Sequence, residues 1–174
     1  NLKSAEGQAQ LKEFLADTDI FLTNFLPERL TAMHLTPDEL MRIKPGLIFG
    51  NLSSYGSSGP DSSVPGYDAT LQGRTGIMHV TGEPNGKPVR AGVSVLDMGA
   101  GMWLAIGVLA ALVKRAETGL GSVVETSLYE TGASWVSYHL SAFQLSGKPS
   151  ERFGASHPAF GPYGLYQTLD GDIC

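Results

Sequence analysis

The chain has 174 residues, of which 42% are hydrophobic and only 17% charged, and its formal net charge at pH 7 is −5. This composition suits about one globular domain with a sizeable core and argues against a wholly disordered chain. The acidic balance argues against non-specific nucleic-acid binding, which needs a basic surface. A single cysteine, Cys174, excludes a disulfide framework and a cysteine-based zinc site within these residues.

The first half of the chain alternates predicted helices with short apolar strands. An amphipathic pattern predicts a helix over residues 4–16, and apolar runs predict strands at 19–25 and 47–53. Between these strands, Thr36-Pro37-Asp38-Glu39 is a strong helix start, because it combines an N-cap threonine, a proline at the first helical position and a capping-box glutamate. The alternation predicts an α/β fold with parallel strand pairing.

The second half begins with a loop rich in Gly, Ser and Pro at 56–66, and such loops after sheet strands often carry function. The segment 67–80 is predicted to be mostly helical. A long apolar helix is then expected from Met98 to Glu117, ended by Gly119, followed by a strand at 122–128 and a second buried helix at 129–145.

The longest apolar run, Met98 to Val113, is 16 residues long and shorter than the ~20 residues that cross a bilayer. We therefore expect a buried core helix and no membrane contact. The chain starts at Asn1 without a methionine and ends in a strand-like pattern, so we expect an internal piece of a longer protein. No signal peptide is recognisable, so a cytoplasmic location is the expectation.

Asp97 directly precedes the apolar helix, which opens with Met98-Gly99-Ala100-Gly101. A carboxylate beside apolar surface needs compensation, and the free N–H groups of a helix N-terminus can supply it. The glycines leave room for a ligand near the backbone. A simple N-cap role, worth ~1 kcal/mol, is compatible with the same position.

Several familiar signals are absent. There is no phosphate-binding G-x-x-x-x-G-K-[ST] motif and no G-x-S-x-G, and the G-x-G at Gly99 and Gly101 lacks the third glycine of the dinucleotide fingerprint. The four histidines have no metal-type spacing, so no metal site is expected.

Short motifs are spread in order along almost the whole chain. They are Asn24-Phe25-x-Pro27, Gly59-Pro60, Pro65-Gly66-Tyr67-Asp68, Thr81-Gly82-Glu83-Pro84, Pro88-x-Arg90-x-Gly92, Asp97, Thr118-Gly119-x-Gly121 and Glu125-Thr126-Ser127-Leu128. Together they resemble the class III CoA-transferase family, to which formyl-CoA transferase and α-methylacyl-CoA racemase belong. The resemblance implies a Rossmann-like large domain, present in part, with a mostly parallel sheet and long buried helices. Residues 1–146 would belong to this domain, and 147–174 to a linker and the start of a small domain.

The resemblance implies that Asp97 is a nucleophile that attacks an acyl-CoA thioester. Backbone donors near Gly99 are expected to stabilise the developing oxyanion. Leu26 replaces an arginine that is frequent in the family, which leaves one phosphate contact to be lost or supplied from elsewhere. The candidate CoA-binding residues are Asn24, Phe25, Tyr55, Arg90, Met98 and Gly99.

Three of these assignments have structural alternatives. Asn24 and Phe25 could simply end a strand with a turn, Tyr55 could anchor a loop, and Arg90 could form a surface ion pair. Trp103 and Trp135 are expected to be core aromatics on buried helices.

The implied reaction is transfer of CoA from an acyl-CoA to a carboxylic acid, by way of an aspartyl anhydride and an aspartyl-CoA thioester, with no metal. The expected partners are an acyl-CoA, a small acid (a dicarboxylate by resemblance) and a second chain in an interlocked homodimer. Two alternatives stay open, a racemase and a non-catalytic CoA-binding module. Racemases of the family typically have Gly-His-Asp where this chain has Gly66-Tyr67-Asp68, and an asparagine where it has Val93. Tyrosine, with a pKa of about 10, is a poor base near neutrality.

Overall fold

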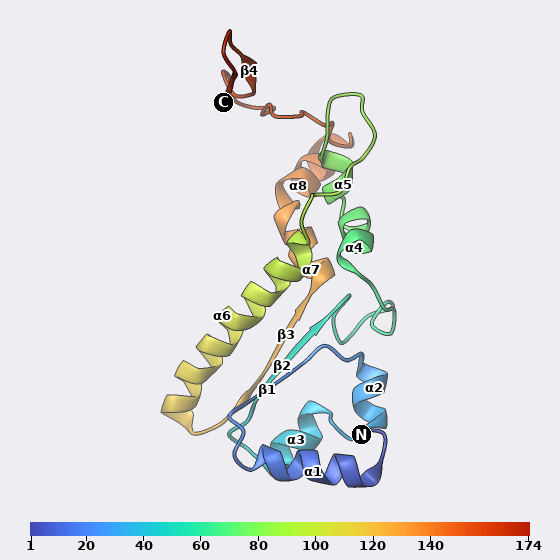
Figure 1. Cartoon of the computed structure of the whole chain (residues 1–174), viewed down its shortest axis with the longest axis vertical. Helices are drawn as coiled ribbons and strands as arrows, with labels where there is room; N and C mark the ends of the chain where they lie inside the picture. The colour runs from blue at the N-terminus through green and yellow to red at the C-terminus, as the bar shows by residue number, and fades with distance from the viewer.

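The computed structural model describes residues 1–174 and centres on a three-stranded parallel sheet. Strand β2 (Ile48–Ser53) lies between β1 (Ile20–Thr23) and β3 (Ser122–Ser127), so the order follows the sequence (Figure 1). In the register, Ile48 pairs with Ile20 on one side and with Ser122 on the other. The predicted α/β class and parallel pairing are confirmed, and all three carboxyl ends lie at one edge of the sheet.

One face of the sheet packs against three short helices, α1 (Ala5–Leu15), α2 (Pro27–Ala32) and α3 (Pro37–Ile43). Phe49 of β2 belongs to their core cluster. The capping box at the start of α3 is present as predicted, and hydrogen bonds from Thr36 lower the pKa of Glu39 to about 2. The sequence analysis did not predict α2, because six residues are too short to show a helical period.

The other face packs against α6 (Val95–Thr118), where Val108 and Ala111 contact Ile48 of β2. Gly50 of β2 has no side chain, and Leu22 of β1 and Leu104 of α6 occupy the space that a Cβ there would need. By length and composition α6 also qualifies as a membrane-spanning helix. A core helix that lies along a sheet meets the same criterion, and α6 lies along β2 and β3 (Figure 1).

Four further helices lie beyond the carboxyl edge of the sheet: α4 (Asp68–Arg74), α5 (Ile77–Val80), α7 (Leu128–Trp135) and α8 (Ser137–Ser146). The predicted helix at 67–80 is divided at Gly76, whose φ of 90° is left-handed. The predicted helix at 129–145 is divided at Val136.

The expectation of long buried helices is correct for one side of α6 only. Large apolar side chains such as Met102 and Leu109 are exposed on its other side, and α8 has no buried residue. Trp103 and Trp135 were expected in the core and are 47% and 43% exposed. Apolar composition reports what a helix can bury, whereas these residues supply a packing partner for only one face of α6 and bury no residue of α8.

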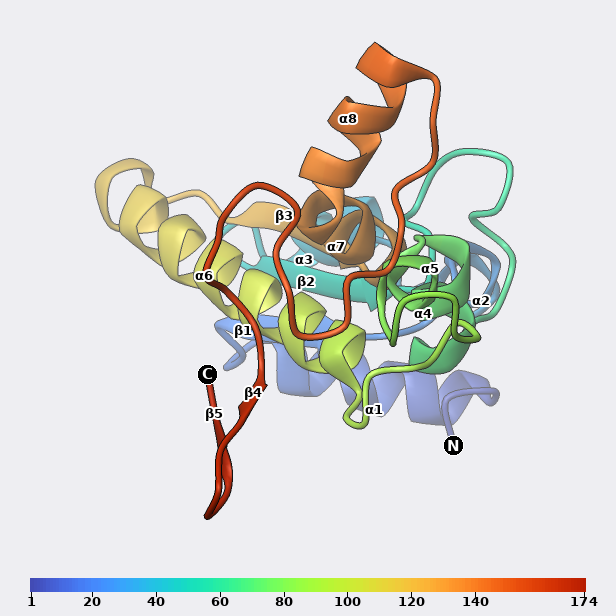
Figure 2. The ribbon, with the colours of Figure 1, turned by 90° about the horizontal axis from the view of Figure 1, so that it is seen from above.

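Residues 147–165 form no regular element. A short antiparallel pair, β4 (Tyr166–Gln167) with β5 (Asp172–Ile173), follows them and projects away from the parallel sheet (Figures 1 and 2). The domain division at residues 146 and 147 stays a prediction.

The close packing of Gly121, in the turn before β3, can be tested by mutation. Gly121 donates its N–H to the carbonyl oxygen of Pro45, and a Cβ at position 121 would overlap the carbonyl oxygen of Leu47. We expect Gly121→Ala to lower the free energy of unfolding of the full-length protein by about 1–3 kcal/mol, the usual range for overpacking. Gly46→Ala is the matched control, since its Cβ meets only an ordinary contact at 3.5 Å. Equal denaturation midpoints for the two variants would contradict this packing.

Candidate active site

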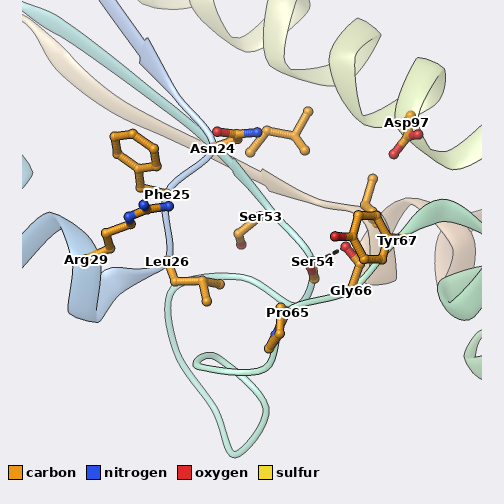
Figure 3. Close-up of a pocket in the computed structure, with 12 residues that line it drawn as sticks. Asn24, Phe25, Leu26, Arg29, Ser53, Ser54, Pro65, Gly66, Tyr67 and Asp97 are labelled. Atoms are coloured by element: carbon orange, nitrogen blue, oxygen red, sulfur yellow. Dashed lines mark hydrogen bonds between the residues drawn. The ribbon is translucent and has the colours of Figure 1, made fainter.

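A pocket of about 420 Å³ opens at the carboxyl edge of the sheet (Figure 3). The segment after β1, the end of β2 and the residue after β3 all line it, because parallel strands bring their carboxyl ends together. The loop before α4 and the first turn of α6 complete the wall. The lining residues are Asn24, Phe25, Leu26, Arg29, Leu52, Ser53, Ser54, Pro65, Gly66, Tyr67, Asp97 and Leu128.

Asn24, Phe25 and Asp97, three of the predicted site residues, line this one pocket although Asp97 lies more than 70 positions after the other two. Asn24 and Phe25 directly follow β1, and Asp97 faces the pocket from the opposite side, on α6 (Figure 3). The fold therefore brings the Asp97 carboxylate and the Asn-Phe pair to one pocket.

Arg29 is a lining residue that the sequence analysis missed. It lies on α2, and its guanidinium carbon lies 5.0 Å from the centroid of the Phe25 ring, in a cation–π arrangement. It is the only Lys or Arg among the lining residues. A signal was available, because Pro27 after Asn24-Phe25 starts a helix whose first turn faces the same strand end. Leu26 replaces an arginine that is frequent in the family, and Arg29 supplies a cation close to that position.

Asp97 is the third residue of α6, so the prediction that it stands before the helix is wrong by one turn. Its pKa is raised above the ordinary 3.8, first by burial and second by the negative charge of Asp68. A carboxylate with a raised pKa is more basic, and therefore more nucleophilic when ionised, than an ordinary one.

The N-terminus of α6 is closed by Asp68, not by a residue of its own. Ser94 occupies the N-cap position without a side-chain bond. The Asp68 carboxylate instead accepts hydrogen bonds from the backbone N–H of Leu96 at 2.8 Å and of Asp97 at 3.4 Å. The simple N-cap role considered for Asp97 is thus excluded.

The expected oxyanion site near Gly99 is not available, because the backbone N–H groups in the first turn of α6 already have hydrogen-bond acceptors. Besides the two N–H groups bonded to Asp68, the N–H of Val95 donates to Val93 and that of Met98 to Ser94. The first turn of α6 therefore has no unpaired donor for a ligand. Gly99 itself faces α7, where a Cβ would overlap the ring of Trp135. Its missing side chain serves close helix packing and not the approach of a ligand.

The other candidate binding residues lie outside the pocket. Tyr55 packs beside the buried cluster around Leu71, and its ring centroid lies 5.9 Å from that of Tyr129. These contacts agree with the structural alternative, in which Tyr55 anchors a loop. Arg90 is exposed in the loop before α6 and forms no ion pair. Met98 is exposed on α6 and does not line the pocket.

Tyr67 lines the pocket on the same side as Asp97 and is 81% exposed (Figure 3). The hydroxyl of Ser54 donates to the carbonyl oxygen of Gly66 at 3.2 Å and holds the loop before Tyr67 against the end of β2. No group of three or more His, Cys, Asp or Glu side chains lies close enough to hold a metal ion.

The whole chain, residues 1–174, matches the sequence model of CoA-transferase family III. It is 38% identical over 170 residues to an acyl-CoA transferase of Fusarium pseudograminearum, an alignment that covers 98% of this chain and 37% of that protein. It is 33% identical over 173 residues to the human succinyl-CoA:glutarate CoA-transferase, covering 99% of this chain and 40% of the relative.

Among solved structures, the fold is similar to that of a CAIB/BAIF family protein from Brucella suis, with a TM-score of 0.87 and 31% identity. That match covers 99% of this chain and 46% of the other. The chain thus spans less than half the length of these relatives.

The raised pKa of Asp97 predicts a pH-dependent effect on stability. A carboxyl whose folded pKa exceeds its unfolded pKa destabilises the folded state once the pH rises above the unfolded value, here 3.8. We expect Asp97→Asn to raise the melting temperature of the full-length protein at pH 7, and the gain to vanish below pH 3.8. Asp17→Asn, at an exposed aspartate, is the charge-matched control. A gain in melting temperature that persists unchanged below pH 3.8 would show that it does not come from the raised pKa of Asp97.

Proposed function

The chain belongs to CoA-transferase family III, and from this premise we propose that it forms part of an enzyme that transfers CoA from an acyl-CoA to a carboxylic acid, with Asp97 as nucleophile. The observation that carries the proposal is the position of Asp97, which faces Asn24, Phe25 and Arg29 across one pocket. A basic carboxylate, an aromatic ring and a cation suit a ligand that has a reactive acyl group at one end and phosphates at the other.

In the proposed first step, a carboxylate oxygen of Asp97 attacks the thioester carbon. The new C–O bond forms as the C–S bond breaks, giving a mixed anhydride and CoA thiolate. The thiolate then attacks the Asp97 carbonyl carbon and releases the donor acid as a carboxylate, which leaves an aspartyl-CoA thioester. An acceptor carboxylate runs the two steps in reverse and restores Asp97. The covalent route conserves the thioester energy.

Protection from water is the main demand of this route, because an anhydride hydrolyses readily. The Asp97 side chain is exposed in this chain although partial burial is the larger cause of its raised pKa, so the proposal requires that bound substrate completes the shielding. The oxyanion of the first step must be stabilised by groups other than the first turn of α6, whose N–H groups are paired.

The acid pair is proposed as dicarboxylic. The human relative is named for succinyl-CoA and glutarate, and the motifs around Tyr67 and Glu83 resemble dicarboxylate-handling members. A cytoplasmic location and an interlocked homodimer complete the proposal as expectations from the sequence.

Peptide mass mapping of the full-length protein after incubation with succinyl-CoA tests the role of Asp97. We expect a CoA-sized adduct on the peptide that contains Asp97, no adduct in Asp97→Ala, and a loss of transfer rate of at least about 10³-fold, as for removal of other covalent nucleophiles. Undiminished transfer by Asp97→Ala would overturn the assignment. Exchange of the α-proton in deuterated water without an acceptor acid, and with no adduct, would instead support the racemase alternative. CoA binding with no Asp97 adduct and no α-proton exchange would support the non-catalytic CoA-binding module.

Arg29 is proposed to bind a phosphate of CoA. Removing a charge-assisted hydrogen bond costs about 1.5–3 kcal/mol, so we expect Arg29→Met to raise the KM for acyl-CoA by about 10- to 100-fold. Arg42→Met is the control, since Arg42 is exposed on α3 and outside the pocket. With an acyl-pantetheine thioester, which lacks the nucleotide phosphates, Arg29→Met and wild type should have similar KM values. An equal rise in KM for acyl-CoA and for the acyl-pantetheine thioester would contradict phosphate binding by Arg29.

A further inference from the structure

We propose that Asp68 is a positioning residue for Asp97: its buried carboxylate fixes the first turn of α6 and places a second carboxylate beside the nucleophile. The proposal rests on the proposed role of Asp97. It concerns a residue of α4, 29 positions earlier in the chain, that does not line the pocket itself.

Asp68 is held rigidly from both sides. It is 5% exposed, and one carboxylate oxygen accepts from the backbone N–H groups of Leu96 and Asp97. The other oxygen accepts from the side-chain amide of Gln72, which is fully buried one turn further along α4. The Gln72 carbonyl oxygen in turn accepts from the N–H of Ala91 at 2.9 Å. This network fixes the loop before α6, the first turn of α6 and α4 in one arrangement.

A purely structural cap does not need a charge. Ser94 stands at the N-cap position, and a serine hydroxyl is among the preferred caps. Burying a carboxylate is far more expensive than burying a hydroxyl, even when donors surround it. The chain nevertheless uses the buried carboxylate and leaves the Ser94 side chain unbonded to the helix end. The helix N-terminus offsets part of this cost because it favours an anion, and the retained carboxylate lies next to Asp97.

The Asp68 carboxylate has a consequence for the charge change of the first chemical step. Asp97 begins that step as an anion and ends it as a neutral acyl anhydride. A helix N-terminus stabilises an anion, which would hold Asp97 in its unreacted form. The Asp68 carboxylate opposes this stabilisation and disfavours the ionised form of Asp97, as the raised pKa of Asp97 reflects. Acylation relieves the repulsion between the two carboxylates.

No other charged group on the neighbouring elements takes this role. On α4, Arg74 pairs with the exposed Asp61. On β3 and α7, Glu125 accepts from Ser57 and Glu130 from Ser127, and neither glutamate lines the pocket. Within the pocket, Arg29 and Tyr67 are the remaining ionisable groups. Asp68 is the one carboxylate bonded to the backbone of Asp97 itself.

The test measures single-turnover release of CoA from succinyl-CoA as a function of pH in the full-length protein. We expect Asp68→Asn to slow acylation of Asp97 by about 10- to 100-fold and to move the acidic limb of the rate profile to lower pH. Asp68→Glu, which keeps the charge, should keep the limb near its wild-type position. Asp61→Asn removes an exposed carboxylate of the same charge and should change neither quantity.

Two results would overturn the inference while the proposed function stands. The first is an Asp97 adduct that forms in Asp68→Asn at the wild-type rate. The second is a slower rate with the acidic limb unmoved, which would make Asp68 a structural cap only. Absence of the adduct in the wild-type protein itself would overturn the proposed function and the inference together. If Asp68→Asn does not fold, Gln72→Met decides: slower acylation at an unchanged KM supports positioning through this network, and an unchanged rate contradicts it.

Discussion

The first turn of a helix contains backbone N–H groups without partners in the helix, and the way α6 meets this requirement organises the rest of the site. The acceptor comes from Asp68 on α4, so α6 can begin only where α4 holds that carboxylate. The same pair of helices contributes Leu71, Leu96 and Ala100 to one buried cluster, so the polar and apolar contacts fix a single arrangement. Asp97 faces the pocket because this arrangement sets the position and rotation of the first turn.

The arrangement carries an electrostatic cost. Asp97 lies where a helix N-terminus would ordinarily favour its ionised form, yet its pKa is raised. Burial and the neighbouring carboxylate outweigh the helix in this structure. Perturbed ionisable groups of this kind are concentrated at functional sites, because a reactive group is one whose surroundings do not fully satisfy it.

Local signals were sufficient for much of the fold. The capping box of α3 lies within four consecutive residues, and Gly119 ends α6 in a left-handed conformation that glycine adopts without strain. Both are decided by neighbours in sequence, and both were predicted. The pocket could be anticipated for a similar reason, because the parallel pairing of three apolar strands brings Asn24 and Phe25 to the same edge as the β2 loop.

The errors concern residues whose role depends on a partner far away in the chain. Gly99 looked like an opening for a ligand until Trp135, 36 positions later, was found opposite it. Asp97 looked like the cap of its own helix because nothing in the sequence around it reveals that Asp68 performs that role. Arg29 was missed because a six-residue helix leaves no periodic signal, although its first turn brings a cation to the pocket. Sequence spacing reports which groups are available, and tertiary contacts decide which of them meet.

Both causes of the raised pKa of Asp97 would strengthen during the proposed reaction. Hydrogen bonds to α4 and α6 hold the Asp68 carboxylate in place, and its repulsion of Asp97 increases when the water that screens it is displaced. The contribution of burial, which is the larger, grows as an acyl chain displaces water from the pocket. In the proposed reaction, binding of an acyl-CoA would therefore raise the pKa of Asp97 further and make its carboxylate more reactive when a thioester is present. The proposed nucleophile would then be least reactive in the empty site and most reactive in the occupied one, where attack on the thioester carbon is productive.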